Sequence, residues 1–149
     1  MTQERFKLFT DGSCLRNPGP GGWAALIIGL DGKKEASGGE AETTNNRMEM
    51  MAVIKGLESL PGGSAIDLYT DSMYVKNGIT LWVKNWKANG WKTAAKKPVL
   101  NKDLWIAISE EVAKHRVTWH WVKGHSGHPE NTYVDKLARR QAQKHAQSA

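Results

Sequence analysis

Two acidic residues stand at the ends of two similar apolar segments, sixty positions apart in the chain. Asp11 follows residues 6–10 and Asp71 follows residues 66–70, and an aromatic residue and a threonine precede each acid. The carboxyl ends of parallel strands meet at one edge of a sheet, so two such strands would bring these carboxylates together. Clustered carboxylates repel one another unless protons or cations neutralise them. The repeated pattern therefore predicts an acidic cluster suited to a divalent cation.

Two more acids fall on segments with a helical pattern. Glu49 lies four residues before Val53 and seven before Gly56, so the three share one helical face, and its carboxylate should point inward or toward a cleft. Asp135 lies three residues before Ala138 in the last predicted helix, which also suggests an inward-facing acid. Helices that begin beside the sheet edge could add both carboxylates to the predicted cluster.

Each acid also has an ordinary structural explanation. Asp11 could open an Asp-Gly turn, and Asp71 could cap the helix that follows it. Glu49 could close a capping box onto Asn46, and Asp135 could lie near a positive helix end. Their combination favours a shared site, because an all-oxygen set of carboxylates suits Mg²⁺ or Mn²⁺ better than zinc. Two such ions roughly 3.5–4 Å apart can activate a water and stabilise the leaving oxygen of a phosphodiester.

Composition narrows the class of protein. A chain of 149 residues is expected to form one domain, and Cys14, its only cysteine, permits neither an internal disulfide nor a cysteine-based zinc site. This cysteine usage fits a reducing cytoplasm. Residues 1–5 lack the apolar core of an export signal, and no apolar run approaches 18 residues, so we expect no membrane insertion.

The net charge of +6 comes from one segment of the chain. Between Asp71 and Asp103 there are seven lysines and no acid, and the rest of the chain carries 14 basic and 15 acidic groups. Such an uneven charge predicts a polyanion that binds on one side of the molecule.

The periodicity predicts a mixed α/β domain. Strands are predicted over residues 6–13, 23–28, 33–38, 66–71 and 117–121. Helices are predicted over residues 46–60, 73–81, 103–114 and 129–144. Loops are predicted over residues 15–22, 96–98 and 124–128, the last of them a mobile one. The first three strands should form an antiparallel meander, and the helical crossover should make the fourth parallel to the first.

Six motifs cover nearly the whole chain in a fixed order: TDGSCLRNPGPGGW (residues 10–23), TTNNRMEMMA (43–52), TDSMYV (70–75), NWKANGWKTAAKKPV (85–99), WVKGHSGHPEN (121–131) and VDKLA (134–138). With these motifs the chain resembles bacterial type 1 ribonuclease H. The resemblance implies an endonuclease that hydrolyses the RNA strand of RNA–DNA hybrids and leaves 3′-hydroxyl and 5′-phosphate ends. It also implies two Mg²⁺ ions, with Mn²⁺ as an alternative, and a five-stranded mixed sheet flanked by helices.

The same resemblance assigns roles to individual residues. Asp11, Glu49, Asp71 and Asp135 match the metal-binding catalytic acids. His125 matches a mobile-loop histidine that assists proton transfer or product departure, although the residue alone would pass for a plain surface histidine. The remaining matches are to substrate-binding positions: Cys14, Asn17, Thr44, Asn45, Asn46, Arg47, Ser72, Trp82, Lys84, Trp86, Lys87, Trp91, Lys92, Lys96, Lys97 and Asn101. The tryptophans and lysines in this list belong to a basic handle at about residues 81–102.

Two positions depart from the family pattern. Met73 stands where glutamine is usual, and Leu100 stands where a basic residue is common. We therefore expect an altered affinity or cleavage pattern with the chemistry retained. The resemblance further implies a monomer that binds a hybrid duplex in the cytoplasm, without an extra N-terminal hybrid-binding domain. The alternatives are a non-catalytic nucleic-acid-binding module, or a nuclease or strand-transfer enzyme of the same fold that acts on DNA.

Overall fold

The computed structural model of the chain describes residues 5–93, 95–122 and 129–147. The strands are β1 (Arg5–Cys14), β2 (Gly19–Gly29), β3 (Gly32–Thr43), β4 (Ala65–Thr70) and β5 (Arg116–Trp121). The helices are α1 (Asn45–Glu58), α2 (Met73–Asn77), α3 (Val83–Ala88), α4 (Lys102–Ala113) and α5 (Pro129–Gln147), with a π-helical segment η1 (Gly78–Trp82) between α2 and α3. Among the described residues no helix is both long and apolar enough to span a membrane.

The five strands form one mixed sheet in the order β3-β2-β1-β4-β5. β1, β2 and β3 pair antiparallel, whereas β4 pairs parallel with β1 and β5 pairs parallel with β4. This arrangement confirms the predicted meander followed by parallel strands. Because β1 is the central strand, Asp11 near its carboxyl end is held by pairing on the β2 side, opposite Ala24.

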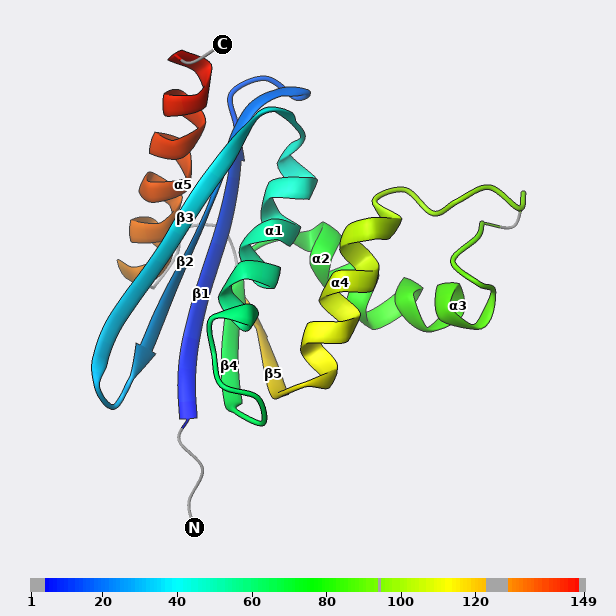
Figure 1. Cartoon of the computed structure of the whole chain (residues 1–149), viewed down its shortest axis with the longest axis horizontal. Helices are drawn as coiled ribbons and strands as arrows, with labels where there is room; N and C mark the ends of the chain where they lie inside the picture. Colours follow the sequence, from blue (N-terminus) through cyan, green and yellow to red (C-terminus); the bar gives the residue numbers. More distant parts are fainter. Residues whose placement is uncertain (1–4, 94, 123–128, 148–149) are drawn as a thin grey trace.

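The helices cover the two faces of the sheet (Figure 1). α1 and α4 lie on one face and α5 lies on the other. Successive side chains of a strand point to opposite faces, so neighbouring residues of β1 belong to different cores. Leu8 is fully buried in the large cluster with α1 and α4, and Phe9 is buried in the smaller cluster with Val134 and Ala138 of α5. The central strand therefore contributes to both cores.

Two glycines let the flanking helices approach the strand backbone. A Cβ added at Gly12 of β1 would lie 2.4 Å from the backbone nitrogen of Glu49 in α1. A Cβ at Gly22 of β2 would lie 2.2 Å from the carbonyl oxygen of Ala138 in α5. Real Cβ atoms do not come this close, so both helices can pack against these strands only because glycine has no side chain. These contacts bring the acids of α1 and α5 toward the strand that carries Asp11.

The β1–β2 and β2–β3 ladders are longer than predicted. The predicted loop over residues 15–22 was wrong for Gly19–Gly22, which belong to β2, because Ser13 and Cys14 continue the ladder by pairing with Gly22 and Gly21. The predicted strand over residues 33–38 was too short, because β3 extends to Thr43, which pairs with Gly19.

The helix predicted over residues 73–81 is present, but it changes type within that range. The α-helix ends at Asn77 and continues as the π-helical η1. A Cβ at Gly78, where η1 begins, would lie 1.8 Å from the ring of Trp105, so that ring packs directly on the backbone there. Trp105 lies on α4, and no local pattern in residues 73–81 could indicate this contact.

The handle, residues 81–102, projects from the body of the molecule (Figure 1). It contains α3 and a segment in which Lys92 pairs with Pro98 through an isolated bridge. Its base is aromatic: the ring centroids of Trp82 and Trp86 are 5.6 Å apart, and those of Trp86 and Trp105 are 5.8 Å apart. This packing attaches the handle to the large core.

Candidate active site

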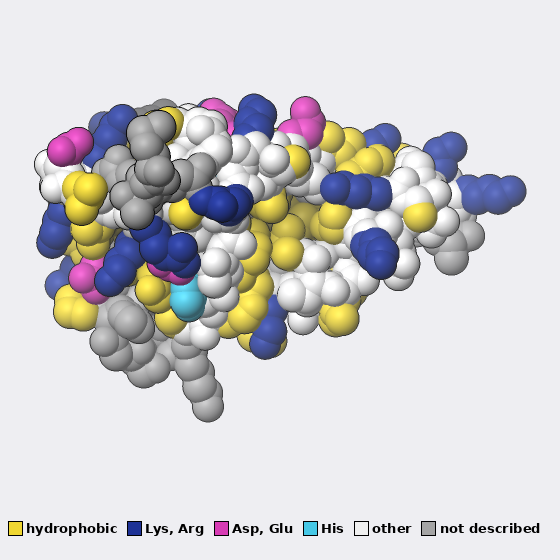
Figure 2. Space-filling model, turned by 90° about the horizontal axis from the view of Figure 1, so that it is seen from below, with side chains coloured by type: hydrophobic (Ala, Val, Ile, Leu, Met, Phe, Trp, Pro, Cys, Tyr) yellow, Lys and Arg dark blue, Asp and Glu magenta, His cyan; other side chains and the backbone are white. Residues whose placement is uncertain are grey.

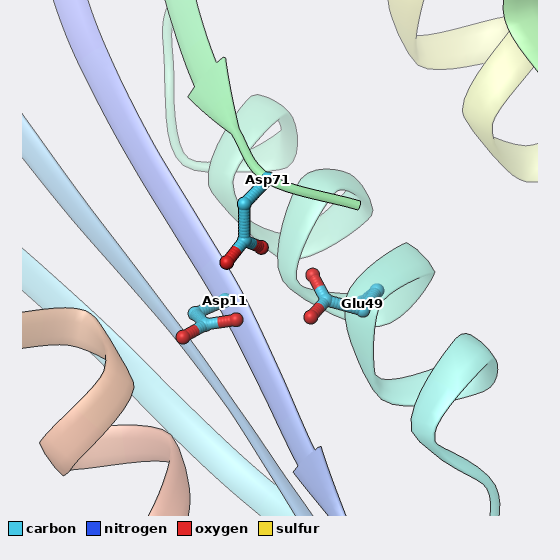
Figure 3. A group of neighbouring side chains, drawn as sticks. All are labelled: Asp11, Glu49 and Asp71. Atoms are coloured by element: carbon cyan, nitrogen blue, oxygen red, sulfur yellow. The ribbon is translucent and has the colours of Figure 1, made fainter. Parts of the chain in front are cut away.

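Three of the four predicted acids converge at the carboxyl ends of β1 and β4. Asp11 lies in β1, Asp71 directly follows β4, and Glu49 lies in the second turn of α1. One carboxylate oxygen from each lies within 4.8 Å of the other two. Figure 3 shows the three carboxylates pointing toward one another from these separate elements. We call Asp11, Glu49 and Asp71 the acidic trio.

Local structure rules out the ordinary explanations for these acids. The cap of α2 is Ser72, whose hydroxyl accepts a hydrogen bond from the Val75 amide at 3.1 Å, so Asp71 is not the cap. Thr44 likewise caps α1 by accepting from the Arg47 amide at 3.2 Å, so the capping box from Glu49 to Asn46 does not form. Asp11 lies within β1 and accepts from the Gly12 amide at 2.9 Å, so it does not open a turn.

Burial makes the trio electrostatically costly. Asp11 and Glu49 are only 6% and 5% exposed. Burial, together with the nearby Asp71 and Asp135, raises the pKa of Asp11 to about 7, although interactions with Glu49 and the Gly12 amide act in the opposite direction. Burial and the neighbouring Asp11 raise the pKa of Glu49 well above its usual range. The trio therefore needs protons or cations at neutral pH.

The donor set of the trio fits a hard divalent cation. All of its ligand atoms are carboxylate oxygens, which Mg²⁺ and Mn²⁺ prefer. Oε2 of Glu49 is buried and has no hydrogen-bond partner among the residues that the structure describes. A buried acceptor without a donor is expensive, and a cation ligated by this oxygen would satisfy it.

Asp135 lies beside the trio. It is the seventh residue of α5, so the positive end of the helix, whose effect is confined to the first turn, does not account for it. Its side chain is 17% exposed, accepts from Arg139 at 2.9 Å, and interacts with Asp11 in the direction that raises the pKa of Asp11. The structure thus brings the fourth predicted acid next to Asp11. His125 lies outside the described residues.

The predicted groove residues gather around the start of α1. Oδ1 of Asn17 accepts from the Asn45 amide at 3.2 Å and links the β1–β2 loop to the helix. The thiol of Cys14 donates to the carbonyl oxygen of Arg16 at 2.6 Å and lies 3.6 Å from the Thr43 carbonyl oxygen. Asn45 is exposed, and Asn46 is partly exposed. These polar groups therefore form one surface next to Glu49.

A second group of predicted residues lies between α1, α2 and α4. Arg47 donates to Oδ1 of Asn101 at 3.1 Å and forms an ion pair with Asp103 at 2.8 Å. Asn101 in turn donates to the hydroxyl of Tyr74 at 3.0 Å. Sequence reasoning missed Tyr74 and Asp103 as members of this group, although Tyr74 lies inside the TDSMYV motif.

The handle presents lysines on its surface and tryptophans toward the core. Trp82, Trp86 and Trp91 are partly buried against the large cluster. Figure 2 shows Lys and Arg side chains along the outer part of the handle. The five handle lysines predicted to bind substrate are all exposed: Lys84, Lys87, Lys92, Lys96 and Lys97.

A different buried acid, Asp67 of β4, was missed by sequence reasoning. Arg5 donates to both of its oxygens at 2.6 and 2.7 Å, and His120 of β5 lies 2.8 Å away. The Arg5 guanidinium, helped by His120, lowers the pKa of Asp67 to about 2 despite burial. Asp67 is thus neutralised by the guanidinium of Arg5, which is the opposite of the situation in the trio.

A mixed five-stranded sheet that presents a carboxylate cluster at its strand ends is the architecture of metal-dependent nucleases of the ribonuclease H fold. The RNase H family model matches residues 3–143. Ribonuclease HI of Brucella melitensis biotype 1 is 59% identical over 136 residues, which cover 91% of this chain and 88% of that protein. The chain therefore belongs to the ribonuclease H family, and within it to the bacterial type 1 enzymes.

Solved structures agree with this assignment. LC9-RNase H1, a type 1 RNase H, superposes with a TM-score of 0.86 at 31% identity over 97% of this chain and 75% of that chain. LC11-RNase H1, solved in complex with an RNA/DNA hybrid, has a TM-score of 0.69 over 93% of this chain and 97% of that chain. At 20% identity, the second comparison bears on the fold alone.

Proposed function

We propose that this protein is a metal-dependent endoribonuclease that hydrolyses the RNA strand of RNA–DNA hybrids and leaves 3′-hydroxyl and 5′-phosphate ends. The observation that carries the proposal is the buried acidic trio at the strand ends of a ribonuclease H fold. The curated relatives, which are named ribonuclease H, support the substrate class.

We propose Mg²⁺ as the metal, held by Asp11, Glu49, Asp71 and Asp135. When bound, a pair of such ions supplies an activated water and stabilises the leaving oxygen. The protein contributes fixed positions: the Gly12 amide holds Oδ1 of Asp11, and the close approach of α1 to β1 holds Glu49 beside it. Asp135, which is held by Arg139, lies next to Asp11. We propose that His125 assists proton transfer or product departure.

The substrate should contact two surfaces beside the trio. Asn45 and Asn46, with Cys14 and Asn17, can offer short polar groups to the 2′-hydroxyls and base edges of the minor groove, which distinguish RNA from DNA. The exposed handle lysines can bind backbone phosphates. We propose that residues 1–149 act as one ribonuclease H domain with its handle at residues 81–102, as a monomer in the cytoplasm.

The test is a cleavage assay with an end-labelled RNA strand in a hybrid. Cutting should require Mg²⁺ and should spare single-stranded RNA and duplex DNA. Asp11→Asn should abolish cutting and keep hybrid binding, whereas Asp31→Asn, an exposed acid in the β2–β3 turn, should leave both unchanged. Wild-type protein that binds hybrid but never cuts it would instead be a binding module, and cutting of duplex DNA would indicate a DNA-acting enzyme of the same fold.

A further inference from the structure

Three aromatic rings stack in a row across the sheet, on the face against which α5 packs. Phe9 of β1, Tyr69 of β4 and His120 of β5 pair in register, so their side chains point to the same face. The ring centroids of Phe9 and Tyr69 are 4.6 Å apart, and those of Tyr69 and His120 are 4.5 Å apart. The last two rings are nearly parallel, with 13° between their planes. The rings therefore form one stack that runs from the central strand to the edge of the sheet.

The stack ends on a ring with an open face. α5 packs on β1, β2 and β3, and Figure 1 shows it away from β5. β5 is an edge strand, so no further strand of the described chain lies beyond His120. In the described part of the chain no ring stacks on the face of His120 opposite Tyr69, and the His120 side chain is 39% exposed. The stack can therefore accept one more flat ring from outside the protein.

Asp67 fixes the orientation of the His120 ring. Its Oδ1 lies 2.8 Å from Nε2 of His120, and Arg5 donates to both of its oxygens. The imidazole is thus held at its edge by Asp67 and on one face by Tyr69, so it loses little rotamer freedom when something stacks on the other face. Because the guanidinium of Arg5 neutralises Asp67, this carboxylate adds little repulsion toward an anion nearby.

The same strand adds an exposed cation. Arg116, Thr118 and His120 alternate along β5 and therefore share one face, and we call them the β5 row. Arg116 is exposed, and none of the ion pairs among the described residues includes it. It lies four residues before His120, which is about 13 Å along a strand. An open aromatic face and an exposed guanidinium on one strip suit single-stranded nucleic acid, which offers stacking bases and backbone phosphates.

The β5 row starts beside the candidate active site. Tyr69 lies two residues before Asp71 and pairs with His120, so the stack is next to the carboxyl ends of β4 and β5. Arg116 lies at the opposite end of β5. A nucleic-acid strand that passes the acidic trio can therefore continue over His120 toward Arg116.

We propose that the β5 row binds a single-stranded extension of the hybrid, with one base stacked on His120 and a backbone phosphate on Arg116. The inference rests on the function proposed above and deepens it, since the preferred substrate becomes a hybrid flanked by single-stranded nucleic acid. Stacking tolerates any sequence, because every base has a π face. The extension therefore adds affinity without a sequence requirement.

The experiment measures binding with a chelator present, so that the substrate stays intact. A blunt hybrid is compared with hybrids that carry a single-stranded extension at one end of one strand. At one of these ends the extension should tighten wild-type binding about fivefold, the effect of one base stacked at an exposed site. His120→Ala should lose this gain and bind the blunt hybrid as wild type does, whereas His120→Phe, which keeps a flat ring, should retain it. A gain that survives in His120→Ala would overturn the proposal.

Matched variants separate the β5 row from net charge. Arg116→Gln should reduce the gain and flatten its log–log dependence on salt by about 1, the effect of one lost phosphate contact. Arg140→Gln, which changes an exposed arginine of α5, should not. His145→Ala removes a partly exposed histidine of α5 and should keep the whole gain. Equal effects of the two arginine variants would overturn the contact with Arg116.

An abasic scan of the extension gives an answer with wild-type protein alone, should His120→Ala fail to fold. Bases are removed one at a time while the backbone is kept. Loss of the gain at one position would identify the stacked base, and a gain that survives at every position would overturn the stacking. Wild-type protein that binds no hybrid at all would remove the proposed function itself. Binding of the blunt hybrid without a gain from any extension would overturn only this inference.

Discussion

Asp11 and Asp67 project from neighbouring parallel strands on the same face of the sheet, yet their carboxyl groups titrate at opposite extremes. Asp67 pairs in register with Lys7, four residues before Asp11 on β1. Burial and other carboxylates raise the pKa of Asp11 to about 7, whereas Arg5 and His120 lower the pKa of Asp67 to about 2. One acid is neutralised by the protein, and the other is left to be neutralised by something that binds.

Replacing these two acids should change stability in opposite directions. In the folded chain Asp11 ionises less readily than its ordinary pKa of 3.8 implies, so its charge destabilises the fold increasingly as pH rises from about 4 to 7. Asp11→Asn should raise the unfolding temperature at pH 7 without divalent ions, by about 2–4 °C for each kcal/mol recovered. Asp67→Asn should lower it. Thermal unfolding by circular dichroism measures both, and a lower unfolding temperature for Asp11→Asn would contradict this account.

The Arg5–Asp67 ion pair should make the stability of the protein depend on pH in the acidic range. Because the folded pKa of Asp67 is lower than 3.8, its contribution is fully present above about pH 4 and is lost as pH falls toward 2. Arg5→Leu should therefore lower the urea midpoint at pH 7, and the difference from wild type should shrink between pH 4 and 2. Lys55→Leu removes an exposed pair with Glu58 and should show little such trend. A constant difference for Arg5→Leu at all pH values would argue against the pair as its cause.

The handle lysines should determine how salt affects hybrid binding. Lys96→Ala/Lys97→Ala should weaken binding and flatten the plot of log affinity against log salt by about 1 for each lysine that contacts a phosphate. The matched control is Lys33→Ala/Lys34→Ala, which replaces two adjacent exposed lysines on β3 and removes the same charge. If both double variants flatten the slope equally, net charge rather than the handle controls affinity.

Gly12→Ala should disturb the site through the backbone. The new Cβ would meet the nitrogen of Glu49 at 2.4 Å, so α1 must move away from β1 and carry the Glu49 carboxylate with it. We expect a loss of about 1–3 kcal/mol in the free energy of unfolding and a higher Mg²⁺ requirement for cleavage. Gly62→Ala, where a Cβ meets nothing within 4 Å, should leave the Mg²⁺ requirement unchanged. An unaltered metal titration for Gly12→Ala would show that the trio tolerates displacement of the helix.

The sequence was informative where the signals were local or belonged to a motif. The antiparallel meander and the parallel fourth strand were predictable from strand periodicity and the helical crossover. The convergence of Asp11, Glu49 and Asp71 was predictable as well, because the two strands end at one edge of the sheet and helical spacing turns Glu49 inward. The loop predicted over Gly19–Gly22 was wrong, because glycine and proline indicate a loop unless a partner strand continues the ladder, as β1 does here. The π-helical segment at Gly78 and the Arg5–Asp67–His120 cluster depend on contacts between residues far apart in the chain. The role of His125 stays a prediction.

The contact between Gly12 and α1 also determines which changes the site can absorb. Glu49 is located relative to Asp11 by backbone lying against backbone, without an intervening side chain. Leu8 and Met50, by contrast, are buried in the large core, where one apolar side chain can often replace another of similar volume. Mutational drift in that core can therefore alter the stability of the protein while the spacing of its acids stays the same.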